Sequence, residues 1–233
     1  MISLRPRNDA HLTALLLAQC FTTFVAIPAA TSGLMGHRLL DLSHLVFAAI
    51  CIVTLTRRRD IQAVLLTAVV LLAAGPPLWD RVGTDLRLGG GAIHLVITLV
   101  AFVFNALITV LVARRAFAPG PVTAHRVQGA VVVYLNVAAL CAIAFDLLEL
   151  YAPGAVRLAA GGMVPVAPGA RTAELSYFSL STITTVGFGD LVPVHPLARS
   201  LASFEAVFGQ LFPATFLARL VALHLAHSTR DAE

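Results

Sequence analysis

Six long apolar segments, separated by short polar stretches, dominate the chain and restrict it to one class of fold. Each is close in length to the roughly 20 apolar residues that a helix needs to cross a bilayer. Hydrophobic residues make up 58% of the 233 residues and charged residues only 12%, which is too few to cover a soluble domain. The sequence therefore predicts an all-α membrane protein. The expected spans are residues 11–30, 39–55, 61–78, 92–112, 127–151 and 197–224.

Arginine residues in the loops between these segments predict how the chain lies in the membrane. A triple arginine at residues 57–59 follows the second segment, and Arg114 and Arg115 follow the fourth. Short loops rich in arginine stay in the cytoplasm. We therefore expect a multi-pass protein of the cell membrane with both termini cytoplasmic. Residues 11–30 also resemble a cleavable signal peptide, and this alternative leaves the remaining topology unchanged.

A glycine-containing run lies between the fifth and sixth apolar segments and reads Thr185-Val186-Gly187-Phe188-Gly189-Asp190. A cation that sheds its water needs replacement oxygens, which consecutive backbone carbonyls supply when they all point the same way. Such a backbone alternates between left- and right-handed conformations, and only glycine adopts the left-handed one cheaply. Gly187 and Gly189 stand where two left-handed positions are needed.

This run resembles the selectivity filter of the potassium-channel family, which reads TVGYG or TVGFG followed by Asp. The close resemblance covers about residues 149–221. It implies passive K⁺ conduction by a homotetramer, because one filter per chain must be completed by three identical copies. It also implies that K⁺ is the permeant ion and that no cofactor is needed. The implied ion ligands are the Thr185 hydroxyl and the carbonyls of Thr185, Val186, Gly187 and Phe188. Asp190 would lie at the outer mouth.

Residues 172–183, just before the filter-like run, predict a short helix. Thr172 is expected to cap it, with Glu174 in its first turn. Its C-terminal end would point toward the ion path, where the negative end of the helix dipole favours a cation.

The resemblance also assigns supporting roles around the filter. Tyr177 and Phe178 occupy the aromatic positions that brace it, and Thr184 supports its base. Phe188 replaces the commoner tyrosine and lacks a hydroxyl, so the filter would be held less rigidly. In the sixth segment, Gly209 stands where the family has its hinge glycine. Pro213, one turn later, should kink the helix because it removes a hydrogen bond.

Several charged residues lie inside or close to apolar segments. Glu205 is expected to hydrogen-bond the back of the short helix near Ser179 or Ser181, the alternative being a functional acid in the membrane. Asp146 and Glu149 are three residues apart and should share one helix face. They are expected to support the outer mouth, and Asp146 could also pair with an arginine.

Voltage sensing is not expected. The fourth segment has His94 and Asn105 as its strongly polar groups and lacks the regularly spaced arginines of a voltage sensor. Arg219 should reach toward lipid headgroups or another helix. His195 is expected to be a solvated loop residue, with a pH sensor as the alternative.

The expected organisation is a four-helix region over residues 1–126, without voltage-sensor charges, followed by a pore domain over residues 127–233. We find no basic stripe that would bind nucleic acid and no pattern of catalytic residues typical of an enzyme. We do not expect a soluble ligand-binding domain after the sixth segment. The alternatives are a less selective cation channel, a potassium transporter or uptake subunit, and a structural or regulatory membrane protein.

Overall fold

The computed structural model describes residues 10–32, 34–55, 66–67, 69–70, 90–118, 124–165 and 167–230. Helices make up most of these residues. They are α1 (Ala10–Phe21), the π-helical turn η2 (Thr22–Ala26), α2 (Ile27–Ala29), the 3₁₀ turn η3 (Ala30–Ser32), α3 (Leu34–Leu55), α5 (Gly90–Ala116), α6 (Ala124–Tyr151), α7 (Pro168–Ile183) and α8 (Pro196–Arg230). Among the same residues are two short strands, β1 (Val156–Leu158) and β2 (Leu191–Pro193).

Within the described residues, four helical stretches are long and apolar enough to cross a membrane. They are Leu12–Ala29, His94–Ala116, Ala124–Tyr151 and Pro196–Arg219. These stretches correspond to the expected first, fourth, fifth and sixth spans. The expected second span falls on α3, whose apolar part, Leu42–Cys51, is shorter. The expected third span, residues 61–78, lies almost wholly outside the described residues.

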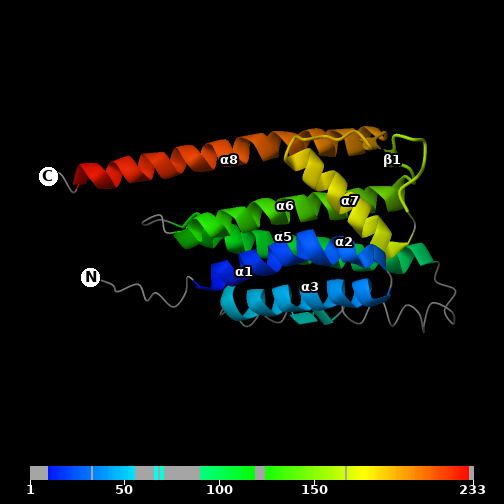
Figure 1. Ribbon diagram of the computed structural model, residues 1–233, viewed down its shortest axis with the longest axis horizontal. Helices are drawn as coiled ribbons and strands as arrows, with labels where there is room; N and C mark the ends of the chain where they lie inside the picture. The colour runs from blue at the N-terminus through cyan, green and yellow to red at the C-terminus, as the bar shows by residue number, and fades with distance from the viewer. Residues whose placement is uncertain are drawn as a thin grey trace.

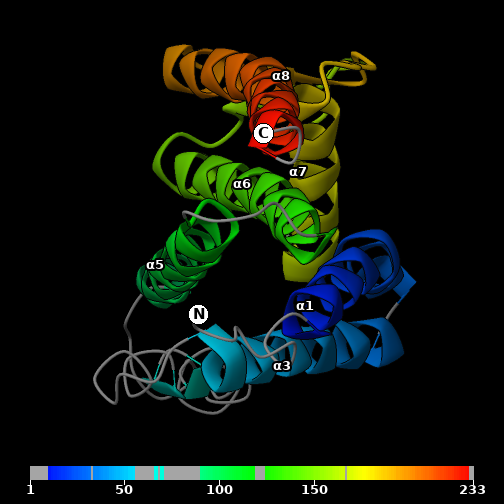
Figure 2. The same ribbon diagram turned by 90° about the vertical axis from the view of Figure 1, so that its left-hand side faces the viewer.

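The long helices run side by side along the long axis of the molecule (Figure 1). Helix α1 begins, and α8 ends, at the same end of this bundle. Seen along that axis, α8 and α3 lie on opposite sides and α6 lies between them (Figure 2). Helix α7 is the exception, because it crosses obliquely from α8 toward α1 and α2. Its two ends therefore join the C-terminal helix to the N-terminal part of the chain.

Two apolar clusters hold these helices together. The first lies where α1, α3, α5 and α6 meet, and its fully buried members include Leu15, Cys51, Ile108 and Val132. The second fixes α7, the strands and the start of α8 to α6. Its buried members are Cys141, Phe145, Ala155, Val156, Val164, Leu175, Phe178, Leu191 and Ala198. The second cluster includes Phe178 of α7 and Leu191, the residue that directly follows the filter-like run.

Helix α7 begins earlier than the sequence suggested, so the expected cap at Thr172 is wrong. The helix starts at Pro168, with Ala167 as its N-cap residue and no side chain capping it. Proline suits the first helical position because its φ is already helical and its missing N–H would have no helical partner there. Glu174 therefore lies beyond the first turn.

The strand pair is a small addition to a fold that is mostly helical, as the sequence predicted. Strands β1 and β2 are antiparallel, with Arg157 opposite Val192, and the Val194 N–H donates to the Ala155 carbonyl at 2.8 Å. The chain that leaves α6 and the chain that enters α8 lie at the same end of the molecule, where their buried backbone groups need partners. Pairing satisfies those groups and connects the end of α6 to the residues that follow Asp190.

Candidate functional site

The filter-like run, residues 185–190, follows directly from the C-terminal end of α7. Thr184 ends the helix with its N–H bonded to the Leu180 carbonyl, and the Thr185 N–H donates to Thr182 O at 2.9 Å. The Gly187 N–H reaches back to the Ser181 carbonyl at 3.1 Å. These bonds hold the start of the run against the last turn of α7, and every residue of the run is exposed.

The backbone of this run has positive φ at alternate residues. The φ values are +59° at Thr185, +56° at Gly187 and +81° at Gly189. The sequence indicated the two glycines but gave no sign of Thr185, because a β-branched residue rarely adopts this conformation. Strain of this kind costs about 1–3 kcal/mol and persists only where neighbouring groups impose it. Alternation of this kind is the feature needed to turn successive carbonyls the same way.

Tyr177 and Asp190 tie the far end of the run back to α7. The Tyr177 hydroxyl donates to Asp190 Oδ2 at 2.9 Å, and the rings of Tyr177 and Phe188 stack with their centroids 5.8 Å apart. The Asp190 carbonyl accepts from the Ala159 N–H at 2.8 Å. Phe178 is buried and packs edge-on against Phe145 of α6. Tyr177 is therefore the direct brace.

Gly209 of α8 lies where two backbones come very close. A Cβ at this position would lie 1.7 Å from the Ile183 carbonyl oxygen and 2.7 Å from its carbon. The same oxygen accepts a hydrogen bond from the Tyr134 hydroxyl at 3.0 Å. The geometry gives Gly209 a packing role at the end of α7, and the hinge that the resemblance implies stays a prediction. Pro213 lies within α8, which continues past it, so the kink stays a prediction.

Glu205 is fully buried between α8 and the back of α7, as the sequence predicted. Its carboxyl group contacts the Ser179 hydroxyl, which also lies 2.6 Å from the Ala138 carbonyl of α6. Three helices therefore meet at this polar contact inside an apolar region, where an unpaired acid would be costly.

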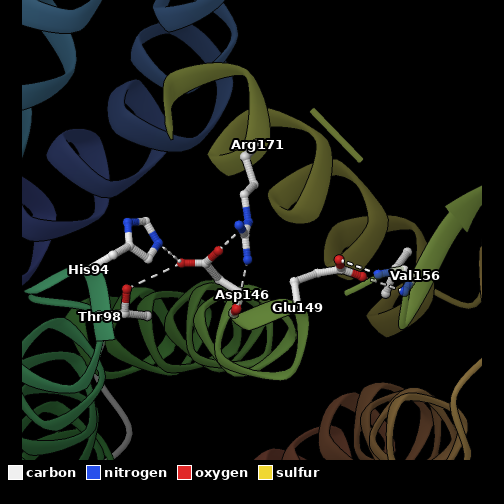
Figure 3. A network of polar contacts seen from close by, with 7 residues as sticks. His94, Thr98, Asp146, Glu149, Val156 and Arg171 are labelled. Atoms are coloured by element: carbon white, nitrogen blue, oxygen red, sulfur yellow. Dashed lines mark hydrogen bonds and ion pairs between the residues drawn. The ribbon is translucent and has the colours of Figure 1, made fainter. Parts of the chain in front are cut away.

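Two carboxylates of α6 anchor the elements that surround the run (Figure 3). Asp146 forms an ion pair with Arg171 of α7 and also contacts His94 Nε2 at 3.1 Å and the Thr98 hydroxyl at 3.3 Å. The expected arginine partner of Asp146 is thus Arg171. Asp146 thereby links α5, α6 and α7.

Glu149, one turn further along α6, stabilises the strand pair. Its two carboxylate oxygens accept hydrogen bonds from the Gly154 N–H at 2.9 Å and the Val156 N–H at 2.6 Å (Figure 3). Glu149 is buried. Sequence reasoning placed it near this end of the molecule but missed its role, because a carboxylate that binds backbone N–H groups leaves no sequence pattern.

Arg219 and His195 have local partners. Arg219 donates to the Phe117 carbonyl at 3.0 Å and lies over the Phe117 ring, so it reaches another helix end, as expected. The His195 ring nitrogen Nδ1 accepts from the Leu197 N–H at 3.3 Å, at the start of α8. This contact gives His195 a structural role in starting the helix.

Comparison with known proteins finds similarity in the part of the chain that contains residues 185–190. Residues 147–224, about a third of the chain, match the model of a family described as "Ion channel". Over 55 residues the chain is 42% identical to the inward rectifier potassium channel Kirbac3.1 of Paramagnetospirillum magnetotacticum. That stretch covers 23% of this chain and 18% of the relative, so the match spans less than a fifth of that protein's length. No solved structure matches the chain. The two matches support a membrane protein with an ion channel domain of the potassium-channel type.

Proposed function

We propose that this chain is one subunit of a K⁺-selective channel, in which residues 185–190 form the selectivity filter. The observation that carries this proposal is the alternation of positive φ at Thr185, Gly187 and Gly189, directly after the C-terminal end of α7. Carbonyl groups turned the same way can replace the water around a K⁺ ion. The partial negative charge at the end of a helix adds a favourable field for a cation.

The proposed pore domain comprises residues 127–233, and the preceding residues form a separate membrane region without voltage-sensor charges. Six spans are supported by the directions of the helices, because α3 and α5 run the same way (Figure 1), as they would with one further span between them. With the arginine-rich loops inside, both termini lie in the cytoplasm and Asp190 faces outward. A C-terminal tag that is accessible from outside intact cells would contradict this orientation.

The proposed assembly is a homotetramer in the cell membrane. One copy supplies one wall of the ion path, and its filter exposes apolar side chains: Val186 is 57% and Phe188 67% accessible. Neighbouring copies would cover these groups, and closed fourfold symmetry would surround the ion with oxygens. Native mass spectrometry of the detergent-solubilised protein is expected to show four copies. A protein that remains a monomer or a dimer under these conditions would rule out this filter.

The function itself is tested by ion flux through pure protein in liposomes. K⁺ is expected to cross and Na⁺ to be retained. The flux should not depend steeply on the imposed membrane potential, because the fourth segment lacks the regularly spaced arginines of a voltage sensor. Equal rates for the two ions would favour the less selective cation channel. Proteoliposomes that pass neither ion would favour a structural or regulatory membrane protein.

A further inference from the structure

Gln210 of α8 reaches the first residue of the proposed filter. Its amide nitrogen Nε2 lies 2.7 Å from the Thr185 hydroxyl oxygen. The two side chains border an open hollow of about 370 Å³, whose other walls are Ala206, Val207 and Leu211 of the same helix. Apart from these two residues the lining is apolar. The pair is thus a polar contact at the edge of an apolar surface.

The single hydrogen of the Thr185 hydroxyl determines which group is the donor in this contact. A threonine hydroxyl has one hydrogen and two lone pairs. The Thr185 hydroxyl donates its hydrogen to the Thr184 carbonyl at 2.7 Å. Its oxygen must therefore accept from Gln210, and this requires the NH₂ end of the amide to face Thr185. One lone pair of the hydroxyl oxygen is then occupied by Gln210, and the second remains available for another group.

The backbone of Thr185 makes this support necessary. Thr185 is β-branched and has a φ of +59°, a conformation that its own side chain disfavours. Its N–H is held by the Thr182 carbonyl, and Gln210 holds its side chain. The Gln210 contact could not be expected from the sequence, since the two side chains are 25 residues apart.

We propose that Gln210 is a positioning residue for ion binding, which holds the Thr185 hydroxyl oxygen as a ligand at the α8 side of the filter. This inference rests on the proposed channel function. In a tetramer, four such hydroxyl oxygens would surround an ion at the inner end of the filter. Each would have its hydrogen directed to Thr184 and its free lone pair available to the ion. Gln210 would contribute through the hydroxyl, not by touching the ion.

Barium is a suitable probe, because Ba²⁺ is close to K⁺ in size and has twice its charge. The affinity of Ba²⁺ for a site therefore depends strongly on the oxygens of that site. The test is Ba²⁺ inhibition of K⁺ tracer flux, with Ba²⁺ added on the side where α8 ends. Gln210→Met keeps the length of the side chain but removes the donor. It is expected to weaken Ba²⁺ inhibition by at least about five-fold, the effect of losing one neutral hydrogen bond, because each of the four subunits loses that bond. Gln210→Asn, which is one methylene too short, should do the same.

A matched control exists elsewhere in the chain. Gln128 of α6 also pairs with a threonine, accepting from the Thr13 hydroxyl at 2.7 Å, far from the filter in the sequence. Gln128→Met should leave Ba²⁺ inhibition within about two-fold of the parent protein. A similar weakening in both methionine variants would mean a general structural effect and would overturn the proposal.

A double-mutant cycle tests whether Gln210 acts through Thr185. In a Thr185→Val background, Gln210→Met should change Ba²⁺ inhibition by less than about two-fold, because no hydroxyl remains to be positioned. In a Thr185→Ser background the full effect should return. Equal effects of Gln210→Met in the valine and parent backgrounds would overturn the proposal. If the parent passes K⁺ selectively and Gln210→Met behaves like the parent, the role of Gln210 is wrong but the channel function stands. If the parent passes no K⁺, both the channel function and the role of Gln210 are wrong.

Discussion

Gly209→Ala is expected to lower the free energy of unfolding of the purified protein by about 3 kcal/mol and to abolish ion flux. The new Cβ would lie 1.7 Å from the Ile183 carbonyl oxygen. Both contacting groups are backbone, so no side-chain rotation can relieve the overlap, and α8 must move away from the end of α7. Overpacking of this kind costs about 1–3 kcal/mol, occasionally more. Thermal unfolding in detergent, followed by circular dichroism, measures the loss.

Gly129→Ala is the matched control, since Gly129 is also a buried helical glycine. A Cβ at Gly129 would lie 3.1 Å from the Ala116 Cβ, so the end of α5 need move by only a few tenths of an ångström, and alanine is the better helix former. This variant is expected to stay within about 1 kcal/mol of the parent protein. A Gly209→Ala variant that is as stable as the parent would contradict the packing role. If that variant also opened or closed differently, the result would support the hinge interpretation.

Glu149→Ala should have the second largest effect, a loss of about 3 kcal/mol in the free energy of unfolding. The substitution leaves the Gly154 and Val156 N–H groups without their acceptors, and a buried donor without a partner costs about 1–3 kcal/mol. Strand β1 should then open, and with it β2, which continues from Asp190. Faster amide hydrogen exchange in β1 and β2 would report the opening, and K⁺ over Na⁺ selectivity should fall.

Glu149→Gln removes the charge but only one of the two acceptor oxygens. Glutamine keeps one oxygen in place, so one of the two hydrogen bonds can persist, and the expected loss is about 1 kcal/mol. If alanine and glutamine both leave the exchange of β1 unchanged, Glu149 does not stabilise the strand pair.

Most of the helical fold could be predicted from the sequence, because a chain in lipid must satisfy its backbone within helices. The fifth segment, for example, was expected at residues 127–151 and forms α6 at Ala124–Tyr151. Two local features were missed. Pro168 starts α7 four residues before Thr172, and β1 and β2 are three residues each, too short for a periodic pattern. Their pairing depends on Glu149, which is distant from β2 in the sequence.

The features of the candidate site that could be predicted are those in which the residue type alone restricts the backbone conformation or requires a polar partner. Gly187 and Gly189 have positive φ, as their spacing suggested, and the buried acid Glu205 contacts a hydroxyl on the neighbouring helix. Thr185 and Gln210 were not predictable in their roles. The φ of Thr185 is imposed by its surroundings, and the Gln210 contact arises only when α8 packs beside α7.

The most direct test of the central claim compares two glycines that both have positive φ but differ in location. Gly187 (φ +56°) lies in the proposed filter and Gly161 (φ +93°) outside it, and a Cβ at either would meet nothing within 4 Å. Alanine at each should therefore cost about 1–2 kcal/mol of backbone strain without a steric clash. The measurement is K⁺ and Na⁺ flux through the purified protein in liposomes.

The parent protein and Gly161→Ala are expected to pass K⁺ and retain Na⁺. Gly187→Ala should lower K⁺ flux by about ten-fold or more, because each subunit's strained peptide would turn a carbonyl away from the ion. Equal K⁺ flux in the Gly187→Ala and Gly161→Ala variants would contradict the assignment of residues 185–190 as the selectivity filter.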